Sequence, residues 1–195
     1  MMKLYYNRPS PYGRVTLVVV HEKKLLDRVE LIQADPWIDP PALIAVTPLS
    51  KVPALVTDDG VLITESMAIC AYLDEVGPPP RLLGGERAPI LSRLGLAQGI
   101  IDAAFISVIE RRRPPELQWP DWIARQRRAL ERTLATLAAP PASRFDLGDV
   151  TLACGLAYMD FRLPEIPWRS SHPGLAEWID RVKQRPSMEA TKPQL

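Results

Sequence analysis

The chain has 195 residues, of which 47% are hydrophobic and 24% are charged, and this balance excludes a disordered or fibrous protein. Its formal net charge is +1, from 24 basic and 23 acidic residues, so it carries no overall field that would hold nucleic acid or an anionic membrane. The length allows one large domain or two small ones.

The first predicted elements are a strand, a helix and a second strand. Residues 3–6 are rich in Leu and Tyr, residues 12–21 place their apolar side chains on one face, and residues 29–33 alternate as a strand does. Ser10 and Pro11 stand just before the helix, at its capping position and in its first turn. The sequence therefore begins with a β-α-β unit.

A hairpin and a third helix follow. Two short apolar runs, 54–57 and 61–63, flank Asp58-Asp59-Gly60, and Asp-Gly favours a tight hairpin turn. Apolar residues then recur at helical spacing over residues 65–76, where Gly77 and three prolines end the pattern. The predicted order is completed as β-β-α.

The second half of the sequence shows helical patterns only. Two long apolar stripes, one ended by Pro114-Pro115, predict a pair of antiparallel helices. Asp146 and Asp149 give the start signature of a further helix that is apolar nearly all round, and a last helix begins near Pro173. We predict an N-terminal domain over 1–76, a linker over 77–87 and an all-helical domain over 88–195.

The cellular location of the protein and the redox state of its cysteines are predicted from motifs that the sequence lacks. The N-terminal residues lack the pattern of a secretory signal, and the longest apolar runs, such as 15–20, are too short to cross a bilayer. Cys70 and Cys154 show no metal-ligand spacing, so we expect two buried, reduced thiols and no metal site. We expect a cytoplasmic protein.

Ser10 is the first candidate site residue. It lies between a predicted strand and a predicted helix, where the backbone N–H groups and the helix dipole favour an anion such as a thiolate. Taken alone, a serine at this position is more often a simple helix cap.

Val52-Pro53 opens the strand of the hairpin and is the second candidate. About 5–6% of X-Pro bonds in folded proteins are cis, and a trans bond at a strand start is the more common case. A cis bond would turn the backbone N–H and C=O of Val52 outward, where an extended peptide can pair with them.

Glu65 and Ser66 open the third helix and are the last candidates. An acidic residue at a helix start is common because it complements the helix dipole. In the same geometry, Ser66 can receive a carboxylate and Glu65 an ammonium group, so the pair can hold the amino-acid end of a ligand.

Together these three motifs, in their β-α-β-β-β-α order, resemble the glutathione transferase superfamily over nearly the whole chain. The resemblance implies an α/β N-terminal thioredoxin-like domain (βαβ-ββα), an all-α C-terminal helical bundle domain and a homodimer. It also implies that glutathione is the co-substrate. The implied glutathione-binding residues are Ser10 at the sulfur, Val52 and Pro53 at the cysteinyl backbone, Glu65 and Ser66 at the γ-glutamyl group, and Lys51 at a carboxylate.

Three points stay open at this stage. Tyr6 is a second candidate for the sulfur contact. Asp102 either faces the γ-glutamyl ammonium, across a dimer interface, or makes an ordinary polar contact. Many family members have Asn-Pro and Gly before the Lys-Val-Pro segment, whereas this chain has Thr47-Pro48-Leu49-Ser50, which leaves the geometry of that turn open.

The resemblance implies conjugation of the glutathione thiolate to a small hydrophobic electrophile held in an apolar cleft, an activity that serves detoxification. No Cys stands near Ser10, which disfavours the thiol-exchange branches of the family. The alternatives are a non-catalytic binding or assembly protein of the same fold, and a glutathione-dependent peroxidase or isomerase.

Overall fold

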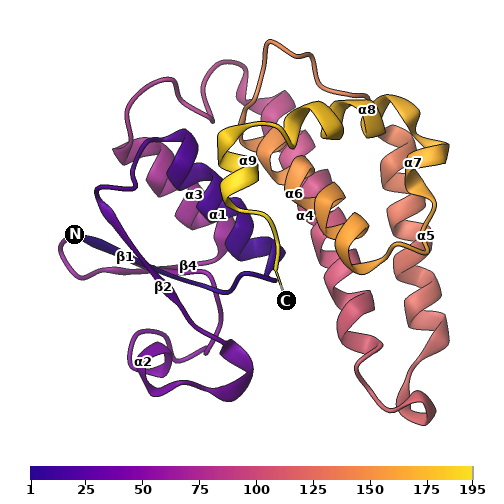
Figure 1. Ribbon diagram of the computed structural model, residues 1–195, viewed down its shortest axis with the longest axis horizontal. Helices are drawn as coiled ribbons and strands as arrows, with labels where there is room; N and C mark the ends of the chain where they lie inside the picture. Colours follow the sequence, from indigo (N-terminus) through magenta and orange to yellow (C-terminus); the bar gives the residue numbers. More distant parts are fainter. Residues whose placement is uncertain (195) are drawn as a thin grey trace. The chain divides into compact units, whose positions relative to one another are not determined.

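The computed structural model describes residues 1–194, which form two compact units (Figure 1). Unit 1 consists of Met1–Gly84 together with the described residues from Pro186 onward, and unit 2 consists of Gly85–Arg185. The predicted helical domain ran over 88–195. The structure differs at its end, because the segment from Pro186 packs on unit 1; residue 195 lies outside the described residues.

Unit 1 is built on a four-stranded mixed sheet with strand order β2-β1-β3-β4. β1 pairs with β2 in parallel and with β3 antiparallel, and β3 pairs with β4 antiparallel. This is the predicted βαβ-ββα arrangement, with the hairpin turn at Asp58-Asp59-Gly60. The strands span Met2–Tyr6 (β1), Val29–Gln33 (β2), Ala54–Val56 (β3) and Leu62–Thr64 (β4).

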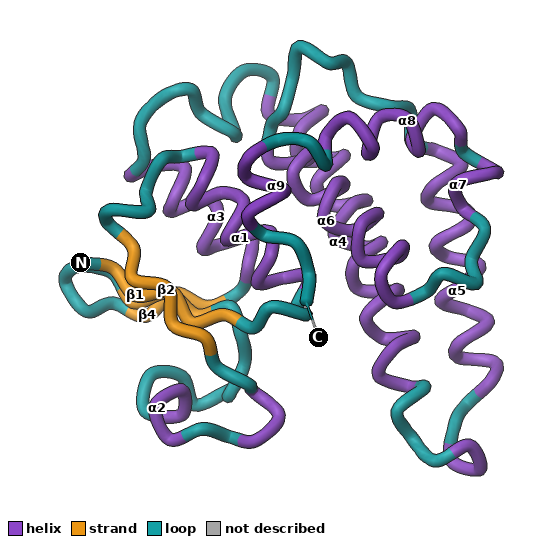
Figure 2. The backbone as a smooth tube through the Cα atoms, in the orientation of Figure 1, coloured by secondary structure: helices purple, strands orange, loops and turns teal. Residues whose placement is uncertain are grey.

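Helices cover both faces of this sheet (Figure 2). The face that carries Tyr5 and Ala54 packs against the buried Leu43 of α2, and α1 and α3 lie together on the other face. The Pro-rich segment 35–41 contains a 3-10 turn and starts α2. The helices of unit 1 are α1 (Pro11–Glu22), η1 (Pro36–Ile38), α2 (Pro41–Ile44), α3 (Ser66–Val76) and α9 (Pro186–Ala190).

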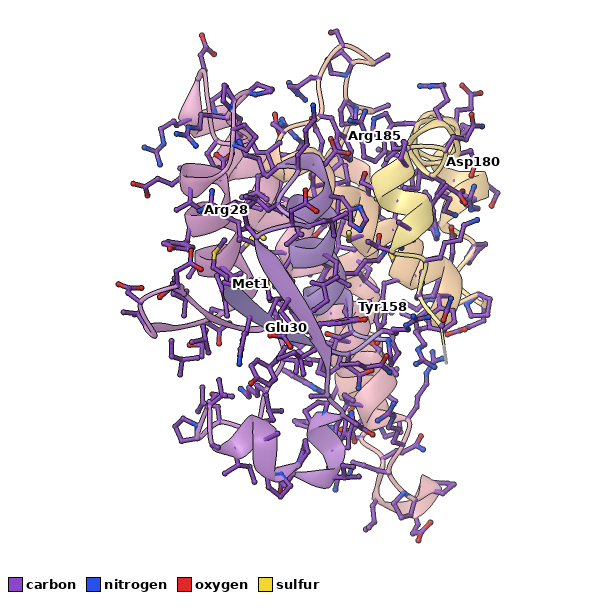
Figure 3. The ribbon with its side chains drawn as sticks, turned by 60° about the vertical axis from the view of Figure 1, so that its left-hand side comes forward. Met1, Arg28, Glu30, Tyr158, Asp180 and Arg185 are labelled. Atoms are coloured by element: carbon purple, nitrogen blue, oxygen red, sulfur yellow. The ribbon has the colours of Figure 1, made fainter. Side chains whose placement is uncertain are left out.

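The far end of the sheet is held by charge pairs around the hairpin turn. The amino group of Met1 lies 2.8 Å from Oδ1 of Asp58, and a guanidinium nitrogen of Arg28 lies 4.0 Å from Oδ2. Met1 and Arg28 are labelled at this end in Figure 3.

Unit 2 is all-helical, as predicted, and α4 packs on both α5 and α6. Gly155 of α6 allows close approach, since a Cβ there would lie 3.3 Å from Ile100 and Ile101 of α4. By length and composition, α4 is the one helix of residues 1–194 that could cross a membrane, a test that the core helix of a helical bundle also passes. The elements are α4 (Arg87–Glu110), η2 (Pro115–Leu117), α5 (Pro120–Thr136), α6 (Leu147–Arg162), α7 (Trp168–Ser171) and α8 (Pro173–Val182).

The start of α6 confirms the predicted helix signature. Asp146 accepts a hydrogen bond from the Asp149 N–H, and the Asp149 carboxylate accepts one from the Asp146 N–H, each at 3.1 Å. This capping box satisfies two backbone donors in a buried position. Cys70 and Cys154 form no disulfide and are fully buried, as predicted.

A buried ion pair fixes the segment that follows α3. Lys23, at the end of α1, places Nζ 2.9 Å from Oδ1 of Asp74 in α3 and donates to the Pro80 carbonyl at 2.7 Å. Asp74 also accepts hydrogen bonds from the N–H groups of Leu82 (2.8 Å) and Leu83 (3.0 Å). Both charged side chains are less than 5% exposed, so the pair ties α1, α3 and the residues after α3 together inside unit 1.

Candidate functional site

The candidate residues of unit 1 meet at one edge of the sheet. Ala54 is paired with Tyr5 on one side and with Thr64 on the other. Neighbouring strands lie about 4.8 Å apart, so the end of β1, the start of β3 and the end of β4 fall within about 10 Å. The loop that carries Ser10 follows β1, Val52 and Pro53 precede β3, and Glu65 and Ser66 follow β4.

Ser10 is a helix cap and still has a donor to offer. Its Oγ accepts a hydrogen bond from the Gly13 N–H at 3.1 Å, and its backbone is extended, as a capping residue requires. A hydroxyl has two acceptor lone pairs and one O–H. Capping uses a lone pair, which leaves the O–H of this half-buried residue able to donate to a ligand. The two interpretations of Ser10 are therefore compatible.

The backbone beside Pro53 has the conformation that the peptide-binding hypothesis assumed. The Val52-Pro53 bond is cis, as the peptide-binding interpretation requires. Among residues 1–194, no hydrogen bond joins the backbone N–H or C=O of Val52 to another group of the protein. Pro53 is buried while Val52 is half-exposed and Lys51 is exposed, so this stretch presents backbone groups and one cation at the sheet edge.

Glu65 adopts a conformation that few non-glycine residues take. It stands at the N-cap of α3 with φ 68° and ψ 122°, and its carboxylate makes no capping hydrogen bond. Such strain costs about 1–3 kcal/mol and tends to persist where function needs it. The exposed Glu65 carboxylate and the buried Ser66, the first residue of α3, thus lie at a second helix N-terminus on the same edge.

The electrostatics of the edge suit a ligand with several charges. The N-termini of α1 and α3 both end here, and each favours an anion. Lys51 adds a positive charge and Glu65 a negative charge to the same edge. The arrangement fits an extended peptide with a thiolate in its middle and an amino-acid group at one end.

The turn before Lys51 closes without the Asn and Gly that the resemblance led us to expect. Thr47 is fully buried, and its side-chain oxygen accepts from the Leu49 N–H at 3.4 Å, while the Ser50 N–H donates to the Thr47 carbonyl at 3.2 Å. Ser50 takes the left-handed conformation, with φ 46°, in the place of glycine. The departure in sequence therefore preserves a tight turn at the cost of local strain.

The two remaining candidates, Tyr6 and Asp102, lie in different units of the structure. Tyr6 is the last residue of β1 and is half-buried at the same edge. Asp102 belongs to unit 2, where it lies on α4 and accepts a hydrogen bond from the Gln98 side chain at 3.0 Å. Among residues 1–194, no group of three or more His, Cys, Asp or Glu side chains could hold a metal ion.

One residue in the same helical turn as Ser10 was not predicted from the sequence. Arg14 lies one turn further along α1 and is only 4% exposed, and its guanidinium donates to the Met188 carbonyl at 3.1 Å. An arginine within an apolar helical run is the only sequence signal for it, and the partner from Pro186 onward becomes visible only in the fold.

Comparison with known proteins agrees with this geometry. The family description "Glutathione S-transferase, N-terminal domain" matches residues 9–76, and "Glutathione S-transferase, C-terminal domain" matches residues 120–181. The chain is 30% identical to the uncharacterized GST-like protein YibF of Escherichia coli, over 98% of each chain.

Solved structures give the same result. A glutathione transferase family member from Pseudomonas fluorescens, crystallised with bound glutathione, is 38% identical with a TM-score of 0.93, over all of both chains. A glutathione S-transferase from Methylobacterium radiotolerans, in complex with glutathione sulfonate, is 32% identical with a TM-score of 0.90, over 100% of this chain and 95% of that one.

Proposed function

Because the chain belongs to the glutathione S-transferase family, we propose that it joins the thiolate of glutathione to a small hydrophobic electrophile. One observation carries the proposal: the hydrogen bond that Ser10 Oγ accepts as a helix cap leaves its O–H able to donate to a ligand. Val52, Glu65 and Ser66 lie at the same edge of the sheet. The glutathione found in the relative from Pseudomonas fluorescens supports the choice of peptide.

Glutathione fits the edge by its three parts. The cysteinyl backbone pairs with the N–H and C=O of Val52 as an added strand. The γ-glutamyl carboxylate is held by the N–H and hydroxyl of Ser66 at the start of α3, and its ammonium group by the Glu65 carboxylate. The exposed Lys51 receives a glutathione carboxylate.

The central task of the site is to stabilise the thiolate. A free thiol has a pKa of about 8.5, so lowering it by about 2 units requires roughly 2.7 kcal/mol of preference for the anion. A hydrogen bond from Ser10 to a charged acceptor supplies about 1.5–3 kcal/mol, and the N-terminus of α1 adds about 0.3–1. These two contributions are sufficient.

The chemical step is a nucleophilic attack. The sulfur lone pair forms a bond to the electrophilic carbon, and either a leaving group departs with its electron pair or the resulting carbanion takes a proton from solvent. Ser10 remains a hydrogen-bond donor throughout and forms no covalent bond. Tyr6, at the end of β1, is the alternative donor.

The test is a titration of the thiolate absorbance of bound glutathione. In Ser10→Ala the pKa of the bound thiol should rise by about 1–2 units, because the lost hydrogen bond is worth about 1.5–3 kcal/mol. Activity at neutral pH should fall and recover partly at higher pH, while glutathione affinity changes little. Tyr6→Phe is the matched variant: a raised midpoint in Tyr6→Phe, with none in Ser10→Ala, would assign the sulfur to the tyrosine.

A second measurement separates an enzyme from a binding module. A protein that is retained on immobilised glutathione but conjugates none of a panel of hydrophobic electrophiles would be a non-catalytic member of the fold.

We further propose that the chain works as a cytoplasmic homodimer. Leu91 and Leu96 on α4 are 47% and 38% exposed, and exposed apolar side chains suit contact with a second copy. Sedimentation at micromolar concentration should show a dimer, and a monomer there would contradict this part of the proposal.

A further inference from the structure

The described residues from Pro186 onward return to unit 1 and lie along α1. The segment starts with α9 (Pro186–Ala190), and its inward side chains are nearly or fully buried: Met188 is 0% exposed, Ser187 4% and Thr191 7%. A five-residue helix has no stability of its own, so its place is set by what it packs against.

The contacts run along α1 in reverse order. Ser187 Oγ donates to the Glu22 carboxylate at the end of α1, and Gln194 contacts Arg8, just before the helix. Between these two ends, Arg14 donates to the Met188 carbonyl at 3.1 Å and to Thr191 Oγ1 at 3.5 Å. The segment therefore lies antiparallel to α1 and is fixed at three levels.

The middle contact, made by Arg14, belongs to the same helical turn as Ser10. The Arg14 N–H donates to the Ser10 carbonyl at 3.0 Å, and the Gly13 N–H donates to Ser10 Oγ at 3.1 Å. A guanidinium that is 4% exposed must keep its hydrogen bonds, because burying its charge without them is costly. The anchored Arg14 side chain and the Ser10 cap thus belong to one helical turn, so the contacts with Met188 and Thr191 restrain the backbone that carries Ser10.

We propose that Arg14 is a positioning residue, which ties the first turn of α1 to the C-terminal segment and thereby holds the Ser10 hydroxyl at the sulfur position. The proposal rests on the proposed function for its chemical consequence, and on the contacts above for its structural part. Effects of this kind are large, since a misplacement of about 1 Å can cost on the order of 100-fold in rate.

The variants compare the Arg14 contacts, which lie near Ser10, with the Ser187 contact at the far end of α1. Arg14→Met removes the donors and keeps the length of the side chain, while Thr191→Val removes one acceptor and keeps the shape. Ser187→Ala is the matched control, because it deletes a buried contact of the same segment at the far end of α1. Arg14→Lys keeps the charge without the forked pair of donors.

The first readout is hydrogen exchange in the free protein. We expect faster exchange over residues 7–14 in Arg14→Met and Thr191→Val, with the Gly13 N–H as the most direct reporter, and no change there in Ser187→Ala. Unchanged exchange over 7–14 in both variants would overturn the proposal, whatever the protein does with glutathione.

The second readout is the pKa of bound glutathione. In Arg14→Met it should rise by about 0.5–1 unit, which lowers the thiolate fraction at pH 7 up to about threefold, with Arg14→Lys in between and Ser187→Ala as wild type. A purely structural role would lower the melting temperature of all variants and leave this pKa unchanged, which would also overturn the proposal. If the wild-type protein itself fails to lower the thiol pKa, the proposed function fails, and the exchange data alone decide the role of Arg14.

Discussion

Asp74→Asn should destabilise the protein severely although it removes a single charge. In the native protein the Asp74 carboxylate faces the buried Lys23 ammonium at 2.9 Å and accepts two backbone hydrogen bonds from Leu82 and Leu83. The asparagine keeps the volume but leaves the Lys23 ammonium, 1% exposed, without its counter-charge.

The expected loss follows from that burial. Removing one partner of a buried ion pair costs about 3–5 kcal/mol, because the remaining charge stays desolvated. Two features of the site favour the full value: both side chains are less than 5% exposed, and each also makes hydrogen bonds to backbone groups after α3. The control is Glu131→Gln in the exposed Arg127–Glu131 pair of α5, for which about 0.5 kcal/mol or less is expected.

The pH dependence of the free energy of unfolding provides a second test of the Asp74 prediction. Burial raises the pKa of Asp74, but hydrogen bonds from the Leu82 N–H, Lys23 and the Leu83 N–H, together with the Lys23 charge, outweigh it and hold the pKa below its ordinary value. The stabilisation is therefore present above the unfolded-state pKa of about 4 and is lost as pH falls through the lower folded-state pKa. The difference in stability between wild type and Asp74→Asn should shrink in that acidic range.

The assay is urea unfolding of wild type, Asp74→Asn and Glu131→Gln at pH 7, repeated toward acid as far as the proteins stay folded. The reasoning would be refuted by an Asp74→Asn loss no larger than that of Glu131→Gln, or by a difference that stays constant as the pH falls below about 4.

Two further predictions concern the candidate site. Glu65→Ala should lower glutathione affinity at least about tenfold, since a charged hydrogen bond is worth about 1.5–3 kcal/mol, while Glu75→Ala on the same helix should leave it unchanged in calorimetry; equal affinities would remove Glu65 from the site. Ser50→Gly should raise the free energy of unfolding by about 0.5–1 kcal/mol, because glycine accepts the left-handed conformation that Ser50 is forced into. Ser50→Ala should give no such gain in thermal unfolding, and equal gains in both variants would show that the backbone conformation is not the cause.

Much of the fold could be predicted because the local signals agreed with one another. Residues 29–33 form a strand, Asp58-Asp59-Gly60 forms the hairpin turn, and Asp146 caps its helix with Asp149. Each of these depends on neighbouring residues only. The segments that were missed, such as α2, sit in Pro-rich sequence, where proline ends one element and also suits the first turn of the next.

The candidate site was predictable in its residues but not in its conformation. Sequence alone could not decide between the cis and trans forms of Val52-Pro53, because the cis form is the minority for any X-Pro pair. The left-handed Ser50 could not be foreseen either, since serine rarely takes this conformation. The role of Arg14 depends on Met188 and Thr191, which lie more than 170 residues away in the chain, and no local pattern reports such a contact.

The return of the chain to unit 1 has a consequence for biosynthesis. A ribosome delivers the whole of unit 2 before the residues that complete unit 1, because Pro186 and its successors come after Arg185. During this interval the Arg14 guanidinium lacks its acceptors on Met188 and Thr191, and the place of Met188 in the core is empty. Nascent unit 1 is therefore expected to stay sensitive to proteases until the residues from Pro186 onward have left the exit tunnel and packed on α1, so that their emergence, and not synthesis of the sheet, marks the point at which the Ser10 turn takes its final form.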